Sequence, residues 1–148
     1  MKIRRANKDD LPILNDISIS SKRYWGYPEA WIEIWKDDLS LSPEDFESMG
    51  IAVICKSSQI IGFCAVSETK SQYEIEHLWI LPEFIGKGFG RELLKTSIEM
   101  FVADQKDILV TADPHAEAFY YKFGFRTIKS VESTPPGRFL PLMIKKLK

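Results

Sequence analysis

Cysteine and histidine are both scarce in this chain. Its 148 residues include two cysteines, Cys55 and Cys64, which are not spaced as a Cys-x-x-Cys pair, and two histidines, His77 and His115. This scarcity excludes a disulfide-built scaffold and a cysteine-based zinc or redox motif. We therefore expect reduced thiols, a cytoplasmic location and no metal site.

Long hydrophobic runs and an excess of one charge are also missing. The longest apolar run, residues 60–66, is far too short to span a membrane, and the N-terminal segment "MKIRRANKDD" lacks the apolar region of a secretory signal. With a net charge of −1, the chain lacks the basic surface typical of nucleic-acid-binding proteins. Because no repeat, low-complexity tract or linker interrupts it, we expect one domain over residues 1–148.

The first part of the chain predicts one short strand and two helices. The strand covers residues 2–6. Apolar residues then recur at helical spacing, at Leu11, Leu14 and Ile17. A break at residues 24–28 separates this helix from a second one, whose predicted shared face is formed by Trp31, Ile34 and Trp35.

Strands and helices alternate in the rest of the chain. Strands are expected over residues 51–56, 60–68, 72–81, 107–112, 125–133 and 138–148, and helices over residues 88–103 and 114–124. The strand–helix–strand unit from Glu74 to Ala112 predicts a parallel strand pair with a right-handed crossover, whereas the flanking hairpins predict antiparallel pairs. The expected fold class is therefore α/β, with a mixed, mostly antiparallel sheet and helices on both faces.

Three glycines alternate in the segment "ILPEFIGKGFGRELL", at Gly86, Gly88 and Gly90. They stand between a predicted strand and a predicted helix, where unpaired amides and the helix dipole favour an anion. Lys87 and Arg91 flank them, which favours a bound anion over the alternative, a tight turn without a ligand. The spacing fits neither a P-loop, because Gly88 replaces the required Ser or Thr, nor a Rossmann fingerprint, because Arg91 replaces the third glycine.

Two segments together resemble the GNAT superfamily of N-acetyltransferases. The segment "IGKGFGRELL" resembles the pyrophosphate loop of that superfamily, Q/R-x-x-G-x-G/A, with Gly88 and Gly90 at the glycine positions. The segment "ADPHAEAFYYKFGF" resembles its second signature, with matches at Ala116, Tyr120, Lys122, Gly124 and Phe125. The order of elements agrees as well. The resemblance covers nearly the whole chain and implies a GNAT-like fold in which the parallel strand pair splays apart.

The resemblance implies that acetyl-CoA is the cofactor. Its pyrophosphate would bind the amides from Gly86 to Arg91, and its thioester carbonyl would lie near the amide of Leu78. Ile85 stands where the family often has Gln or Arg, and Asp113 stands where many members have Asn, whose two donors a carboxylate cannot supply. The residues expected to bind the cofactor are Leu78, Trp79, Ile80, Ile85, Gly86, Lys87, Gly88, Phe89, Gly90, Arg91, Asp113, Ala116, Phe119 and Tyr120.

Acetyl transfer to an amine needs a base, because an amine that is protonated at neutral pH must lose a proton before it attacks. The segment "YEIEHLWI" offers Glu74, Glu76 and His77 beside the expected thioester. Strand alternation would place Glu74 and Glu76 on one face with Leu78 and turn His77 away. Glu76 is therefore the preferred base, acting through water, and Glu74 and His77 stay open. The alternative for Glu76 is a solvated carboxylate.

Tyr120 matches the general acid of the family, which protonates the departing thiolate. Its alternative is an aromatic core contact, a role that Phe119 is expected to take. Cys64 lies in an apolar strand and is expected to be a small core residue rather than a nucleophile that carries the acyl group. We therefore expect direct attack in a ternary complex.

The acceptor side is expected at the helix break, where Trp25 and Tyr27 would form pocket walls. Lys22 and Arg138 would hold an amine that also bears a carboxylate, with Glu76 facing the amine. The sequence thus predicts an acetyl-CoA-dependent N-acetyltransferase of a small primary amine, with no nucleic-acid or membrane partner. A non-catalytic acyl-CoA-binding sensor or regulatory module is the alternative. A homodimer formed through the C-terminal strands stays open.

Overall fold

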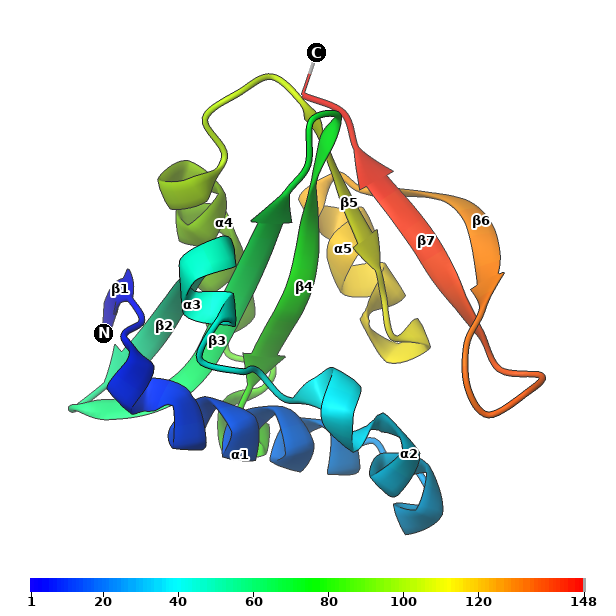
Figure 1. The fold of residues 1–148 in the computed structure, drawn as a ribbon, viewed down its shortest axis with the longest axis horizontal. Coiled ribbons are helices and arrows are strands. Elements are labelled where there is room, and N and C mark those ends of the chain that lie inside the picture. Colours follow the sequence, from blue (N-terminus) through cyan, green and yellow to red (C-terminus); the bar gives the residue numbers. More distant parts are fainter. Residues whose placement is uncertain (148) are drawn as a thin grey trace.

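A single mixed sheet of seven strands organises the molecule. The computed structural model describes residues 1–147 (Figure 1). The strand order in the sheet is β1-β2-β3-β4-β5-β7-β6. The strands are β1 (Lys2–Arg5), β2 (Gly50–Lys56), β3 (Gln59–Glu68), β4 (Gln72–Ile80), β5 (Asp107–Thr111), β6 (Arg126–Glu132) and β7 (Phe139–Lys145). Lys148, the last residue of the strand expected over 138–148, lies outside the described residues.

Five α-helices and three short 3-10 helices connect the strands. The α-helices are α1 (Leu11–Arg23), α2 (Glu29–Leu39), α3 (Asp45–Ser48), α4 (Phe89–Phe101) and α5 (Glu117–Phe123). The 3-10 helices are η1 (Lys8–Asp10), η2 (Pro82–Phe84) and η3 (Pro114–Ala116). Within residues 1–147, no helix is both long and apolar enough to cross a membrane. The element order and the mixed sheet confirm the predicted fold class.

Helices cover both faces of the sheet because the strands alternate their apolar side chains. Ala52 on β2 packs with α4 residues Leu93 and Leu94 in one buried cluster. Its neighbour Val53 points to the other face and packs with Leu14 of α1. Figure 1 shows α1 and α2 together on one side of the sheet, with α4 and α5 on the other.

The parallel pair β4–β5 opens the sheet. The two strands pair from Gln72↔Asp107 to Ile75↔Val110. Beyond Ile75, β4 continues to Ile80 while β5 ends at Thr111, and Figure 1 shows the two strands diverging toward their carboxyl ends. The splayed pair is the one the sequence resemblance implied, and it leaves one backbone edge of β4 without a neighbouring strand.

A bulge in β4 corrects the predicted alternation. Ala65 of β3 pairs with His77, and Val66 pairs with Ile75, so Glu76 has no partner across β3. Because of this extra residue, Ile75 and Leu78 pack into the same cluster although they are three positions apart. Glu74 consequently lies on the face opposite Leu78, and the prediction that Glu74, Glu76 and Leu78 share a face was wrong.

The buried face of α2 also differs from the prediction. Ile32, Trp35 and Leu39 form its buried stripe, whereas Ile34 is 52% exposed. Trp31 is partly buried beside this stripe. The spacing i, i+3, i+7 from Ile32 places Ile34 on the solvent side, so only Trp35 of the expected trio is fully buried.

The edge strand β6 is the element that a homodimer would extend. Its residues are almost all exposed, and it pairs with β7 on one side only. The sheet edge that the sequence singled out is therefore available. Dimer formation through it stays a prediction.

Candidate active site

The glycine loop leaves an open surface at the N-terminus of α4. Gly86 and Gly88 adopt left-handed backbone angles, with φ of 81° and 88°, and Gly88 is the N-cap of the helix. A Cβ built on either glycine would meet no atom within 4 Å. Glycine is therefore needed here for the backbone conformation and not to accommodate neighbouring protein atoms.

Amide groups around α4's first turn are oriented for an anion. The helix's first backbone hydrogen bond runs from the amide of Glu92 to the carbonyl of Gly88. The preceding amides, up to Arg91, therefore have no helical acceptor, and the helix dipole adds partial positive charge at this end. This geometry suits a phosphate group.

One cavity of about 590 Å³ joins the glycine loop to the opening between β4 and β5 and to the helix break after α1. Most residues predicted to bind the cofactor line it, namely Leu78, Trp79, Ile80, Ile85, Gly86, Gly88, Gly90, Arg91, Asp113, Ala116, Phe119 and Tyr120. Lys87 and Phe89 do not line the cavity. Phe89 packs against the core and meets Phe84 edge-on, and the Lys87 Nζ lies 5.9 Å from the centre of the Phe84 ring.

Glu76 is an exposed carboxylate on the cavity wall. The β4 bulge presents it, and its Oε2 accepts a hydrogen bond of 2.6 Å from the hydroxyl of Ser67. Glu74 does not line the cavity; burial and the nearby charge of Glu76 raise its pKa above the ordinary value. Of the two carboxylates, Glu76 is the one that a bound molecule would meet.

His77 is a buried sheet residue. Its Nδ1 accepts a hydrogen bond of 3.1 Å from the indole N–H of Trp79, so the ring's other nitrogen carries the proton in the neutral form. Burial lowers the pKa of His77 to about 4. The imidazole is therefore neutral at physiological pH and its basic nitrogen is already occupied.

Tyr120 combines the two roles that the sequence left as alternatives. Its ring is 5% exposed and packs edge-on against Phe119 and Phe125 in the core, yet the residue also lines the cavity. Burial raises the pKa of Tyr120 far above its usual 10. The phenol is therefore protonated at physiological pH and is able to donate.

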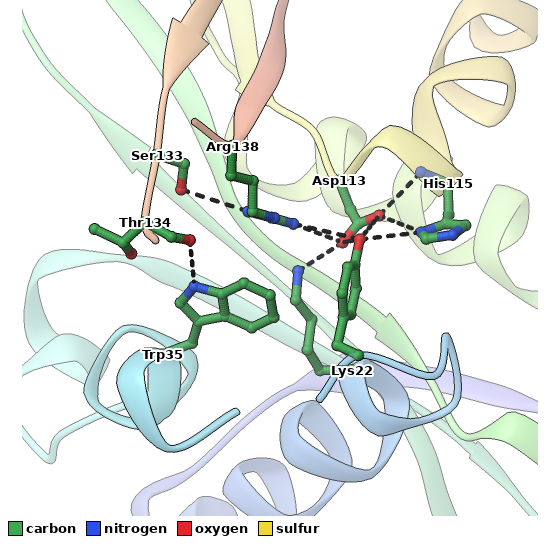
Figure 2. A network of polar contacts seen from close by, with 8 residues as sticks. Lys22, Trp35, Asp113, His115, Ser133, Thr134 and Arg138 are labelled. Carbon is green, nitrogen blue, oxygen red and sulfur yellow. Dashed lines mark hydrogen bonds and ion pairs between the residues drawn. The ribbon is translucent and has the colours of Figure 1, made fainter. Parts of the chain in front are cut away.

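Asp113 lies at the centre of a polar cluster, which we call the Asp113 cluster (Figure 2). The Nζ of Lys22 lies 2.6 Å from Oδ2, and the hydroxyl of Tyr27 is 3.0 Å from the same oxygen. His115 donates its backbone amide to Oδ1, at 2.9 Å, and its Nδ1 lies 2.8 Å from that atom. Arg138 contacts both the carboxylate and the Tyr27 hydroxyl.

The Asp113 cluster carries three charges in a nearly dry environment. The side chains of Lys22, Asp113 and Arg138 are 10%, 11% and 10% exposed. Burial opposes ionisation of Asp113, but the hydrogen bond and charge of Lys22, with further hydrogen bonds from His115, lower its pKa to about 2. Burial lowers the pKa of Lys22, and Asp113 acts against this effect. The carboxylate is therefore fully ionised at neutral pH.

Aromatic rings enclose the Asp113 cluster. Trp25, in the helix break, stacks on His115 with ring centroids 4.6 Å apart and an interplanar angle of 11°. Trp35 of α2 lies under the Arg138 guanidinium, 4.4 Å from its centre to the ring centroid. The Trp35 indole also donates a hydrogen bond of 2.8 Å to the carbonyl of Thr134, which ties α2 to the β6–β7 loop (Figure 2).

A profile described as the acetyltransferase (GNAT) domain matches residues 29–145 of this sequence. The chain belongs to the GNAT acetyltransferase family. It is 32% identical to an uncharacterized N-acetyltransferase of Archaeoglobus fulgidus over 67% of this chain and 72% of that protein. It is 28% identical to the uncharacterized N-acetyltransferase YafP of Escherichia coli over 68% of this chain, which corresponds to 59% of YafP.

Solved structures of GNAT proteins share this fold. The PaiA N-acetyltransferase of Thermoplasma acidophilum, crystallised with coenzyme A, superimposes with a TM-score of 0.82 at 20% identity, covering 98% of both chains. A GCN5-related N-acetyltransferase of Rhodopseudomonas palustris gives 0.81 at 18% identity, covering 98% of this chain and 94% of the other. At these identities the likeness establishes the fold.

His115 is the member of this GNAT site that sequence reasoning missed. Within residues 1–147, no group of three His, Cys, Asp or Glu residues is placed to hold a metal, so the role of His115 lies in its contacts with Asp113. The available signal was the Asp-x-His spacing, which lets Asp113 accept from both the backbone and the ring of His115. His115 also lines the cavity.

The predicted acceptor residues divide into two groups. Lys22, Trp25 and Glu76 line the cavity. Tyr27 and Arg138 do not line it, but they contact Asp113 directly from behind the wall. Lys22, Tyr27 and Arg138 therefore meet at Asp113, while Trp25 and Glu76 line the same cavity.

Proposed function

We propose that this chain is an acetyl-CoA-dependent N-acetyltransferase that acts on a primary amine of a small molecule. The observation that carries the proposal is the single cavity that reaches from Gly86 and Gly88 to Lys22 and Trp25. One end has the amides and the open surface of an anion site. The other end is enclosed by charged and aromatic side chains suited to a small polar acceptor.

Acetyl-CoA fits the groups that the cavity presents. The amides from Gly86 to Arg91 would hold the pyrophosphate, and the open space above Gly86 and Gly88 allows the phosphates to approach the backbone closely. The Arg91 side chain would add a cation. The free edge of β4 beyond Ile75 would receive the pantetheine arm. When bound, acetyl-CoA supplies the activated acetyl group as a thioester.

Glu76 and Tyr120 would divide the proton transfers. Glu76 would accept the proton of the amine through water, as an exposed carboxylate on the same wall as Leu78. The amide of Leu78 would stabilise the oxyanion. Tyr120 would donate its proton to the leaving sulfur, a role supported by its place on the lining of the cavity.

The state of Cys64 favours direct attack over a covalent acyl-enzyme. Its side chain is completely buried, and burial raises its pKa to about 12. A thiol in this environment is a poor nucleophile because the thiolate is the reactive form. Acetyl transfer would therefore take place between the two substrates in one ternary complex.

Thiol release with a panel of primary amines tests the proposal. We expect the wild type to release CoA in the presence of an acceptor, and Glu76→Gln to lower kcat by roughly 10²-fold. This loss should lessen at high pH, where more of the amine is already neutral. The matched control is Glu74→Gln, which removes the neighbouring carboxylate outside the cavity and should leave turnover near normal.

One result would contradict the assignment of the base, and another would contradict acetyl transfer itself. Full activity of Glu76→Gln would show that this carboxylate is not the base. Binding of acetyl-CoA, seen as a raised melting temperature, without thiol release for any amine would favour the alternative, a non-catalytic acyl-CoA-binding module.

A further inference from the structure

The Asp113 cluster contains one more buried cation than anion. Lys22 and Arg138 are the cations and Asp113 the anion, and each side chain is about nine-tenths buried. The two cations share one oxygen of the Asp113 carboxylate, Oδ2, which lies 2.6 Å from Lys22 and 3.5 Å from Arg138. A buried charge that has no counter-charge is energetically unfavourable, and a group of opposite charge beside it removes this cost.

All three groups are ionised in this arrangement. Arg138 keeps its proton because a guanidinium does not titrate in the physiological range. Asp113 is ionised because two cations and several donors surround it. Lys22 is held as an ammonium by its short contact to that carboxylate and by the rings of Tyr27 and Trp35, 5.1 and 4.7 Å from its Nζ. The cluster thus carries a net positive charge.

Lys22 is the cation of the Asp113 cluster that lines the cavity. An ammonium group has three donors. Within residues 1–147, the Asp113 carboxylate is the one polar partner that Nζ reaches, and the other neighbours are aromatic faces. Because Lys22 lines the cavity, an anionic group in the cavity would find unaccepted donors there.

Glu76 supplies the opposite charge on another part of the same wall. Lys22 and Arg138 both pair with Asp113, whereas Glu76 accepts its hydrogen bond from Ser67, so Glu76 is not an ion-pair partner of the Asp113 cluster. The acceptor end therefore presents a negative group on the bulge of β4 and a positive group on α1. A molecule with a cationic end and an anionic end matches this pattern.

We propose that the acceptor is an amino carboxylate of the amino-acid type, bound with its amine toward Glu76 and its carboxylate at Lys22. This rests on the proposed acetyl transfer. The carboxylate would use the free donors of Lys22 and balance the extra charge that Arg138 brings. A diamine or polyamine would place a second cation beside Lys22, and a plain alkylamine would leave the charge unbalanced.

The alternative is that Lys22, Asp113 and Arg138 only hold the elements together. The Lys22–Asp113 pair joins α1 to the end of β5, and Arg138 adds the β6–β7 loop. A purely structural cluster predicts that substitution changes stability but not the choice of substrate. Discrimination between an acid and its amide therefore separates the two roles.

The experiment compares amino acids with their own carboxamides. The panel is the standard amino acids and β-alanine, each paired with the amide that lacks the negative charge. Turnover is measured by thiol release, and binding is measured by calorimetry in the presence of CoA. For the wild type we expect the preferred acid to exceed its amide by roughly tenfold or more in kcat/KM.

Three variants assign the preference to the Asp113 cluster. Lys22→Met removes the charge at similar length and should abolish the preference for the acid. Lys22→Arg keeps the charge and should retain most of it. Lys36→Met, on the exposed surface of α2, is the matched control and should behave as the wild type.

The outcomes separate this proposal from acetyl transfer itself. In one outcome, amino acids bind to the wild type but not to Lys22→Met, and neither protein releases thiol. This outcome would support the anion site and contradict the enzymatic role. Amides acetylated as well as acids would overturn the proposal while leaving the transferase intact. Retention of the acid preference by a folded Lys22→Met, or no detectable binding or turnover of any acid, would also overturn it.

Discussion

Replacement of Asp113 by asparagine should destabilise the protein in a strongly pH-dependent way. Asparagine keeps the shape of the side chain but removes the charge that Lys22 and Arg138 share. Both cations would then lie about nine-tenths buried with no counter-charge. Loss of one partner of a buried ion pair is far more costly than loss of an exposed one, because the remaining charge cannot be solvated.

The size of the effect follows from the ionisation of Asp113. A folded-state pKa of about 2, against an ordinary value of 3.8, corresponds to about 2.4 kcal/mol of stability at neutral pH, since one pKa unit is about 1.4 kcal/mol. Loss of a buried partner typically costs about 3–5 kcal/mol. We expect about 2–4 kcal/mol.

The pH dependence gives the sharper test. Because the folded-state pKa of Asp113 is depressed, its contribution is fully present above the unfolded value of 3.8 and disappears as the pH falls through about 2. The difference in unfolding free energy between wild type and Asp113→Asn should therefore be constant from pH 7 to about pH 4.5. It should then shrink toward acid, as the wild-type side chain becomes a neutral acid.

Urea denaturation at a series of pH values measures this difference. Glu29→Gln is the control, because it removes a carboxylate from the exposed pair with Arg23 and should be indistinguishable from wild type. Lys22→Met in the Asp113→Asn background should recover part of the lost stability, because it removes one unpaired cation. Equal stability of wild type and Asp113→Asn at neutral pH, or a penalty that persists unchanged to pH 2, would refute this electrostatic account.

Three further predictions concern the cofactor end of the cavity. Gly88→Asp should weaken CoA binding at least about tenfold, because its charge would face the pyrophosphate, and calorimetry measures this loss. The control is Gly88→Ala, which has the same backbone strain without the charge and should bind CoA more tightly than Gly88→Asp. Arg91→Ala should raise the KM for acetyl-CoA more than it lowers kcat, with an effect that shrinks at high salt. Lys87→Ala, outside the cavity lining, should have the smaller effect of the two, and the reverse order would contradict this assignment. Tyr120→Phe should bind CoA normally but turn over slowly at every pH, so recovery at high pH would exclude its role as the acid.

The elements that follow a regular period were predictable from the sequence. The helix over Phe89–Phe101 repeats its apolar residues at helical spacing, and the strands around it alternate or are fully apolar. Neighbouring parallel strands need a crossover connection, usually a helix, so the strand–helix–strand pattern of β4, α4 and β5 indicated the parallel pair, and the family resemblance implied that this pair opens beside the glycine loop.

The Asp113 cluster was only partly predictable because its members come from distant segments. Lys22 and Asp113 are separated by most of the chain, and no period links them. The sequence placed Asp113 among the cofactor ligands, since that position follows β5 in the family pattern, whereas its carboxylate is occupied by Lys22, Tyr27 and His115. Asp113 follows the end of β5, and tertiary packing decides whether its side chain faces the cofactor or the residues of α1 and the helix break. The local spacing of the sequence does not contain this information.

The bulge at Glu76 shows how one residue of irregularity decides the chemistry of the wall. In an unbroken strand, Ile75 would share a face with His77 and Trp79, and Leu78 would point to the other side. The bulge instead keeps Ile75 and Leu78 on one apolar face and leaves Glu76 unpaired against β3. An unpaired residue is free to present its side chain at the rim, where the Ser67 hydroxyl steadies the carboxylate. The bulge therefore allows Ile75 and Leu78 to pack in the core while Glu76 lines the cavity. A regular strand with this sequence would turn either Ile75 or Leu78 away from that apolar cluster.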